Sequence, residues 1–277
     1  MRKTSLLLTA LGLGLSAFAV QVRAQSATAA GSPSTRGAPV SAPVDARWKS
    51  SFDAFAAEDK LHAPEPGGVL FVGSSSIRLW NGLEEAFATP GQAVTKRGFG
   101  GSRMLDCAQY VQDLVLPYKP RLVVVYAGDN DLAEGRTPQQ VLQSFTQFTE
   151  TVRQALPDTR IAYLSIKPSP LRASLVPAVR ETNSLIAAYA QATPNLDFID
   201  IFSPMLTADG QPRSELFSAD SLHMNAEGYA LWRSVISPHL RPAGVQQAVL
   251  QAPAQPAAAT TTSAPQALKT LVSTSGR

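Results

Sequence analysis

A carboxylate and a histidine three residues apart, Asp220 and His223, form the most informative pair in this sequence of 277 residues. A single turn can hold the Asp220 carboxylate against one imidazole nitrogen of His223. That contact fixes the tautomer and leaves the other nitrogen free to accept a proton from a nucleophile. The alternative is that Asp220 caps a helix that begins near Asn225, with His223 as a partly exposed loop residue. Taken alone, the pair favours this alternative, so a nucleophile must be sought elsewhere in the chain.

A candidate nucleophile lies in the serine-rich turn Gly73-Ser74-Ser75-Ser76-Ile77, which follows a short apolar run. A serine at a strand-to-helix turn can project its hydroxyl from the edge of a sheet, and its backbone N–H can donate to an oxyanion. The turn is not the Gly-x-Ser-x-Gly elbow of the α/β-hydrolases, because Ile77 occupies the fifth position. A serine-rich turn or helix cap without catalytic function is the alternative.

Two further polar turns suit the binding of an oxyanion. The glycines of Arg97-Gly98-Phe99-Gly100-Gly101-Ser102 expose backbone N–H groups, although Arg103 stands where a dinucleotide fingerprint needs its third glycine. In Gly128-Asp129-Asn130-Asp131-Leu132, the Asn130 carboxamide can donate a hydrogen bond without adding charge. The alternatives are a tight turn for the first and a divalent metal site for the second. A metal is disfavoured because the acidic loop lacks calcium-loop spacing and the histidines lack ligand spacing.

The apolar pattern predicts the elements that must position these turns. The predicted strands cover residues 69–72, 93–96, 121–127, 161–166 and 196–201, and the second is the weakest. The predicted helices cover residues 45–58, 104–115, 138–155, 178–191 and 226–237. Because helices alternate with nearly continuous apolar strands, we expect a mostly parallel sheet with helices on both faces. Ligands bind such sheets beyond the carboxyl ends of the strands, and all four polar turns follow strands.

The two ends of the chain differ in composition from its middle. Residues 1–24 contain basic residues, an apolar run and a small-residue site, which predicts a signal peptide cleaved after Ala24 and export to the periplasm or medium. An uncleaved N-terminal anchor is the alternative. Residues 25–43 and 243–277 are rich in Ala, Pro, Ser and Thr, which is typical of flexible segments. Residues 44–242 are long enough for one domain.

The formal net charge of +3 belongs to the predicted signal peptide. Arg2, Lys3 and Arg23 lie in that segment, which leaves 21 basic against 21 acidic residues. A near-neutral mature chain has no global attraction for nucleic acid. No later segment approaches the roughly 20 apolar residues of a membrane span. Cys107 is the only cysteine, which excludes an intrachain disulfide, and nothing in the sequence specifies an oligomeric state.

In this order the four turns resemble the sequence blocks of the SGNH, or GDSL-like, hydrolase family of esterases and lipases. The resemblance spans about residues 52–240. Gly73-Ser74-Ser75 is similar to the family's Gly-Asp-Ser block, which makes Ser75 the expected nucleophile. Ser74 departs from the pattern, because the family usually has Asp at this position. The carboxylate that the family places beside its nucleophile is therefore missing here.

The remaining blocks of the family also have counterparts. Gly101 is similar to the block II glycine, Asn130 to the block III asparagine, and Asp220 with His223 to the Asp-x-x-His block. The resemblance implies a flavodoxin-like α/β/α sandwich of three layers with a mostly parallel five-stranded sheet. It implies a triad of Ser75, His223 and Asp220, and an oxyanion hole made by Ser75 N–H, Gly101 N–H and the Asn130 side chain. We expect no cofactor and no metal.

We therefore expect a serine esterase whose partner is a small-molecule or glycan ester, with short acyl or carbohydrate-linked groups favoured by the short loops after the strands. The alternative within the family is a lysophospholipase or thioesterase. The alternative from another class is a catalytically silent, glycan-binding envelope protein. His62 and His239 are expected at the surface or in packing. Trp80 is close enough to the nucleophile turn to line an acyl pocket.

Overall fold

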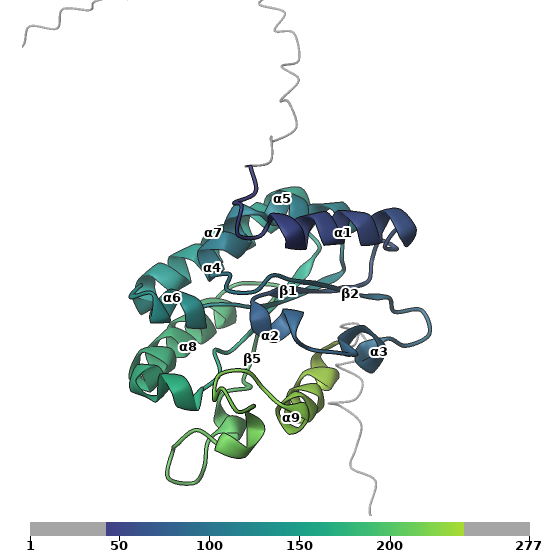
Figure 1. Cartoon of the computed structure of the whole chain (residues 1–277). Helices are drawn as coiled ribbons and strands as arrows, with labels where there is room; N and C mark the ends of the chain where they lie inside the picture. Colours follow the sequence, from purple (N-terminus) through teal and green to yellow (C-terminus); the bar gives the residue numbers. More distant parts are fainter. Residues whose placement is uncertain (1–42, 241–277) are drawn as a thin grey trace, which may run out of the picture. The chain divides into compact units, whose positions relative to one another are not determined.

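The computed structural model describes residues 43–240, and a five-stranded sheet forms the centre of this range (Figure 1). Its strands are β1 (Val69–Gly73), β2 (Val94–Gly98), β3 (Leu122–Tyr126), β4 (Arg160–Leu164) and β5 (Leu196–Ile199). Their order in the sheet is β2-β1-β3-β4-β5, and every neighbouring pair is parallel. The predicted parallel sheet is confirmed, and the five predicted strands are its five strands.

Strand residues alternate between two buried faces, which explains the nearly continuous apolar runs. In β1, Leu70 and Val72 pack into one apolar core, while Val69 and Phe71 pack into the other. Their side chains are almost completely buried on both sides. The sheet is therefore the middle layer of a three-layer α/β/α sandwich.

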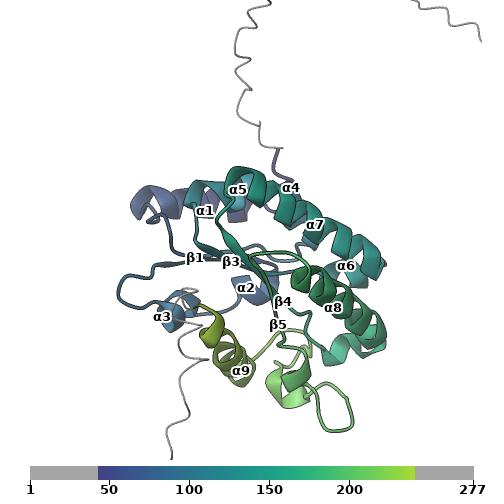
Figure 2. The ribbon, with the colours of Figure 1, turned by 180° about the vertical axis from the view of Figure 1, so that it is seen from behind.

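Five helices cover the face on which Leu70 and Val72 lie: α1 (Lys49–Leu61), α4 (Met104–Gln109), α5 (Val111–Leu114), α7 (Pro138–Ala155) and α8 (Val176–Gln191). Figure 1 shows these helices on one side of the sheet, and the view from behind in Figure 2 agrees. Phe145 and Phe148 of α7 are fully buried in this core.

The opposite face is covered by α2 (Ser75–Arg78), α3 (Leu83–Phe87) and α9 (Ala226–Ile236). Trp232 of α9 is fully buried there against Tyr126 of β3, with ring centroids 4.9 Å apart. The short helix α6 (Asp129–Ala133) continues from the end of β3. The remaining helical turns are 3-10 helices: η1 (Leu116–Tyr118), η2 (Pro170–Leu175), η3 (Ser203–Met205), η4 (Ser214–Leu216) and η5 (Ser237–Leu240).

Two helices begin at residues whose side chains cap them. The Thr137 side chain accepts a hydrogen bond from Gln140 N, and Thr137 N donates one to Gln140 Oε1, so α7 starts with a complete capping box. The Asn225 side chain accepts from Gly228 N at the start of α9. Asp220 is therefore not the cap of this helix.

Some predicted helix limits are wrong. The first helix begins at Lys49 rather than at residue 45, and residues 104–115 form two helices that meet at Tyr110. The predicted signal peptide, nearly all of the predicted flexible segment 25–43, and the predicted tail 243–277 lie outside the described residues. Within residues 43–240, no helix is both long enough and apolar enough to cross a membrane.

The strand order reverses its direction of winding between β1 and β3. The chain passes from β1 to β2 on one side and then returns past β1 to form β3 on the other. Ser75 follows β1 after one intervening residue, and Asn130 follows β3 by a few residues. The two turns meet at the switch point, where open parallel sheets bind their ligands.

Candidate active site

The imidazole of His223 bridges Ser75 and Asp220. Its Nε2 lies 3.0 Å from Ser75 Oγ, and its Nδ1 lies 2.6 Å from Asp220 Oδ2. A carboxylate can only accept a hydrogen bond, so Nδ1 carries the proton and Nε2 of the neutral ring is an acceptor facing the serine hydroxyl. This is the relation of nucleophile, base and orienting carboxylate that acyl transfer needs. The structure brings together the three residues that the sequence predicts as a triad.

The Asp220 carboxylate also fixes the backbone of its own turn. Its Oδ1 accepts hydrogen bonds from Leu222 N at 3.0 Å and His223 N at 2.9 Å. Ser221 turns the chain with a φ of 57°. The hydrogen bond from the His223 ring, together with these two backbone donors, lowers the pKa of Asp220 to about 2. The carboxylate is therefore ionised at any pH at which His223 acts as a base.

The backbone at the end of β1 determines where Ser75 lies. Gly73 has a φ of +149°, and a Cβ at this position would lie 1.9 Å from Tyr126 O in the neighbouring strand. Ser74 N donates to the same carbonyl at 3.0 Å. Only glycine permits this close approach, which places Ser75 at the first position of α2. Its N–H is one of the helix-terminal donors that a helix does not use internally.

Ser74 stands where a carboxylate was expected from the resemblance, and its side chain is completely buried. Its Oγ has no hydrogen-bond partner among residues 43–240. The contacts that the structure gives Ser75 come instead from His223, and through it from Asp220. The geometry of the nucleophile and base is thus formed without a carboxylate at position 74.

The three candidate oxyanion donors line the same cavity as Ser75 and His223. This cavity has a volume of about 490 Å³, and Gly101 and Asn130 are among its lining residues. Gly101 has a φ of +79°, a conformation that favours glycine. Within the described residues, neither Ser75 N–H nor Gly101 N–H has a hydrogen-bond acceptor. Asn130 Nδ2 donates one hydrogen to Ser102 O at 3.0 Å, which leaves its second hydrogen available.

The lining of this candidate catalytic cavity also includes Arg47, Trp48 and Arg78, which the sequence motifs do not single out. Trp48 is nearly completely buried, and its indole N–H donates to Gly100 O at 3.0 Å, so it supports the glycine-rich turn. No acidic residue of the described range lines the cavity. Arg78 follows the nucleophile by one helical turn, which was a usable signal, whereas no motif marks Arg47 or Trp48.

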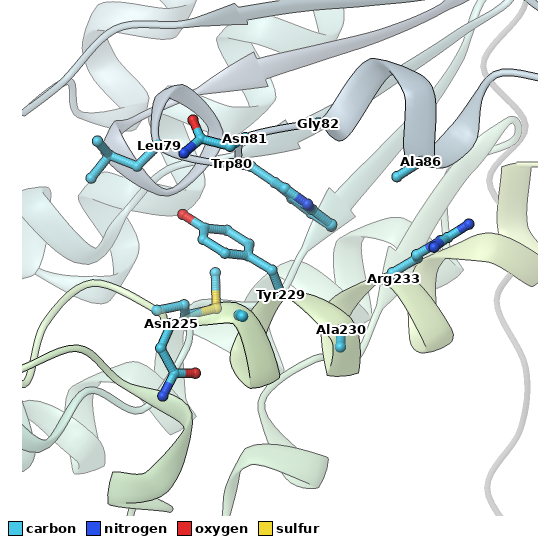
Figure 3. Close-up of a pocket in the computed structure, with 11 residues that line it drawn as sticks. Leu79, Trp80, Asn81, Gly82, Ala86, Asn225, Tyr229, Ala230 and Arg233 are labelled. Carbon is cyan, nitrogen blue, oxygen red and sulfur yellow. The ribbon is translucent and has the colours of Figure 1, made fainter.

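A second cavity of about 510 Å³ lies between the segment after α2 and helix α9. Figure 3 shows Trp80 and Tyr229 lying side by side there, and their stacked rings have centroids 5.0 Å apart. Trp80 lines this cavity and not the catalytic one, so the expectation that it lines an acyl pocket is wrong. Neither His62 nor His239 belongs to either cavity.

The sequence matches the model of one protein family. The GDSL-like lipase/acylhydrolase family matches residues 70–231, which include Ser75, Gly101, Asn130 and the turn from Asp220 to His223. No curated protein matches the chain.

Several solved structures resemble this one. A protein from Streptococcus pneumonia has a TM-score of 0.62 and 20% identity, over 70% of this chain and 93% of its own. A GDSL-like lipase from Bacteroides thetaiotaomicron has a TM-score of 0.57 and 23% identity, over 68% and 96% respectively. A family 3 carbohydrate esterase from Clostridium thermocellum has a TM-score of 0.50 and 14% identity, over 67% and 99%. These similarities show a shared fold, the three-layer fold of SGNH hydrolases.

Proposed function

This chain belongs to the GDSL-like lipase/acylhydrolase family, hydrolases that act on ester bonds, and from this premise we propose that it is an exported serine esterase with Ser75 as its nucleophile. The observation that carries the proposal is the position of the His223 ring, which is within hydrogen-bond distance of both Ser75 Oγ and Asp220 Oδ2. Acyl-enzyme chemistry requires this pair of contacts at a single imidazole.

Acylation begins when His223 Nε2 removes the Ser75 proton as Oγ attacks the ester carbonyl. The carbonyl double bond becomes a single bond to an oxyanion, which collapses to expel the alcohol. The imidazolium gives its proton to the departing alkoxide, so Ser75 carries the acyl group and His223 is neutral again. Asp220 stabilises the imidazolium and keeps the ring in the required tautomer.

Deacylation repeats these steps with water as the nucleophile. His223 removes a proton from the water as it attacks the acyl carbon, and then returns that proton to Ser75 Oγ as the acid leaves. In both tetrahedral intermediates, the oxyanion accepts hydrogen bonds from Ser75 N–H, Gly101 N–H and the Asn130 carboxamide. Donors of this kind stabilise charge that exists only in the transition state and the intermediate.

The shape and charge of the catalytic cavity support a small, polar ester as substrate. The cavity is open, and Ser50, Ser51, Gly100 and Gly101 contribute to its lining. Its lining includes two arginines and no acid within the described range, which favours neutral or anionic esters over cationic ones. The fold shared with a carbohydrate esterase agrees with an acyl group carried on a sugar.

A series of p-nitrophenyl esters from acetyl to palmitoyl tests this proposal. The full-length chain should hydrolyse the acetyl ester with the highest kcat/KM, and Ser75→Ala should reduce turnover by about 10⁴-fold or more. A preference for palmitoyl would favour lysophospholipid or related lipid chemistry instead. Absence of turnover with every ester, together with binding to a glycan array, would favour the catalytically silent envelope protein.

A further inference from the structure

A buried group of charges lies behind Asn130 and includes none of the triad residues. Lys167 and Asp129 are 2% and 5% exposed, and Lys167 Nζ lies 2.9 Å from Asp129 Oδ2. Lys167 Nζ is also 3.1 Å from the hydroxyl of Tyr126. Arg172 Nη1 approaches the same Asp129 oxygen to 3.2 Å. Two cations therefore share one carboxylate.

The second amine of the Arg172 guanidinium contacts the candidate oxyanion donor. Arg172 Nη2 donates to Asn130 Oδ1 at 3.0 Å, while Asn130 Nδ2 donates to Ser102 O at 3.0 Å. A guanidinium only donates hydrogen bonds, so the atom facing Arg172 must be the amide oxygen. The backbone N–H of Asn130 also donates to Asp129 Oδ1 at 3.0 Å. Both ends of the carboxamide are therefore held by hydrogen bonds, and the second hydrogen of its NH₂ group remains available to donate to an oxyanion.

The net charge of Lys167, Arg172 and Asp129 favours the stabilisation of an oxyanion near Asn130. Burial raises the pKa of Asp129, but the charges of Lys167 and Arg172 outweigh that effect and leave the pKa below its ordinary value. With Asp129 ionised, one positive charge in the group is not balanced. A guanidinium bound to an amide oxygen also polarises the amide, which strengthens the hydrogen bond that its N–H donates. Oriented charge of this kind stabilises a transition-state oxyanion.

We propose that Arg172 is a positioning residue of the oxyanion hole, which orients and polarises the Asn130 carboxamide while Asp129, itself bound by Lys167, holds the guanidinium in place. This inference rests on the proposed esterase function. Arg172 does not line the catalytic cavity, so it acts through Asn130 and not by touching the substrate. Of these two side chains, only that of Asn130 donates a hydrogen bond to the oxyanion.

A double-mutant cycle with p-nitrophenyl acetate tests the inference. Asn130→Ala should lower kcat by about 10²- to 10³-fold, the effect of losing one oxyanion donor. Arg172→Gln should lower kcat and kcat/KM equally, by about 10- to 100-fold, because a misplaced catalytic group costs up to about that much. In the Asn130→Ala background, Arg172→Gln should have an effect of less than about twofold, because the group through which it acts is gone.

Two further variants separate positioning from a general effect on the fold. Arg172→Lys keeps the charge, but one ammonium does not have the fork that reaches Asp129 and Asn130 together, so its kcat should lie between those of the wild type and Arg172→Gln. If Arg172→Gln does not fold, the cycle is run with Arg172→Lys. Arg213→Gln is the matched control, because Arg213 also has an ion pair with Glu215 and donates to Pro204 O, away from the catalytic cavity.

A trifluoromethyl ketone provides a second readout, because its adduct with a serine hydroxyl carries an oxyanion. Its affinity should fall by the same factor as kcat/KM in Arg172→Gln. Full activity of a folded Arg172→Gln, or equal factors for Arg172→Gln in the wild-type and Asn130→Ala backgrounds, would overturn the inference while leaving the esterase proposal intact. The esterase proposal itself would be rejected by a different result, namely undiminished turnover by Ser75→Ala.

Discussion

At the scale of single residues, the site depends on one imidazole that joins distant parts of the chain. Ser75 and His223 are 148 positions apart, yet their side chains lie within 3.0 Å of each other. His223 is oriented by Asp220, only three positions before it, which also accepts from the backbone of the same turn. The base is thus positioned locally, whereas the nucleophile is brought to it by the sheet.

Asp220→Asn should lower kcat for p-nitrophenyl acetate by about 10⁴-fold with little change in KM, because the amide holds His223 in the wrong tautomer and gives no charge to the imidazolium. The pKa of Asp220 is lowered to about 2, so the wild-type carboxylate is already ionised above pH 4. Protonation of Asp220 in the wild type should therefore contribute nothing to any pH dependence of the loss between pH 5 and pH 8. Asp209→Asn, an exposed aspartate hydrogen bonded to Thr207, is the control. Retention of a tenth of the activity by Asp220→Asn would contradict the triad.

At the scale of elements, the ends of β1 and β3 determine where the side chains of the candidate site lie. β1 ends at Gly73 against the carbonyl of Tyr126, and β3 leads through Gly128 into the turn that carries Asn130. Each turn is constrained by a glycine whose Cβ would collide with a neighbour. The precision of the site therefore depends on backbone contacts next to it.

Gly73→Ala should damage both stability and activity. The new Cβ would lie 1.9 Å from Tyr126 O, and the φ of +149° is unfavourable for alanine, so β1 and the Ser75 turn must shift. We expect a loss of at least about 1–3 kcal/mol in the free energy of unfolding. A displacement of Ser75 of about 1 Å should lower kcat by about 10²-fold. Urea unfolding and steady-state kinetics measure the two effects.

Gly91→Ala is the matched control for this substitution. Gly91 also has a positive φ, of +78°, but a Cβ there would meet no atom within 4 Å. It lies outside the catalytic cavity, so its replacement should reduce stability through backbone strain alone and leave kcat unchanged. Equal kinetic effects of the two variants would show that the contact with Tyr126 does not position Ser75.

A buried carboxylate on α6, Asp131, binds the start of α4, and its titration should affect stability. Asp131 accepts from Met104 N at 2.7 Å, and burial raises its pKa to about 6, despite this donor and the charge of Arg136. The folded state therefore binds the proton more tightly than the unfolded state, whose ordinary value is 3.8. The stabilisation of the folded state by this proton is fully present below pH 3.8 and is lost as the pH rises through about 6.

Urea unfolding of the wild type and Asp131→Asn at pH 4, 5, 6 and 7 measures this effect. The free energy of unfolding of the wild type relative to Asp131→Asn should fall by up to about 3 kcal/mol as the pH rises from 4 to 7. The amide still offers an oxygen to Met104 N, so the comparison isolates the charge. A difference that is constant or increases with pH would refute the raised pKa.

The sequence alone predicts the strands and long helices, because their apolar periods are long enough to read. The Pro138–Ala155 helix is predicted to the residue, since Thr137 and Pro138 mark its start. The helices α2 and α6 are missed, because four or five residues carry no period. The break at Tyr110 is also missed, because the apolar pattern continues through it.

The candidate site likewise contains residues that the sequence predicts and residues that only the folded structure reveals. The short motifs, their positions after strands and the family resemblance predict Ser75, Gly101, Asn130, Asp220 and His223 as site residues. The structure brings their side chains or backbones to one cavity or into contact with His223. Arg172 lies in the 3-10 helix η2 after a proline-rich stretch, where an arginine has no expected role, and only the folded structure brings it to Asn130. The prediction for Trp80 relied on its proximity to Ser75 in the sequence. The chain after α2 instead directs this side chain into the other cavity.

At the scale of the whole molecule, the proposed catalytic groups come from four separate turns that one parallel sheet gathers at a single edge. Each layer of helices contributes to this arrangement, since α2 and α9 flank Ser75 and His223 on one face while Trp48 supports the glycine-rich turn from the other. The chemistry is therefore expected to be lost together with the fold, with no separable catalytic segment.

Export is the prediction that belongs to the whole chain. If residues 1–24 are a signal peptide, the protein produced from the full sequence in a Gram-negative host should be found in the periplasm or medium with Gln25 as its first residue. N-terminal sequencing or intact-mass measurement checks this outcome. Recovery of the full-length chain in the cytoplasm would reject export, and recovery of the full-length chain in the membrane fraction would favour an uncleaved anchor.

The assignment of Ser75 as the nucleophile is tested by the site of covalent modification with a fluorophosphonate. The reagent phosphonylates an activated serine with loss of fluoride, and peptide mass spectrometry identifies the residue. We expect a single adduct on Ser75, formed at a rate that parallels esterase activity, and greatly slowed labelling in His223→Ala with its fold intact. An adduct on Ser74 or Ser76, or an active esterase that the reagent does not modify, would contradict it.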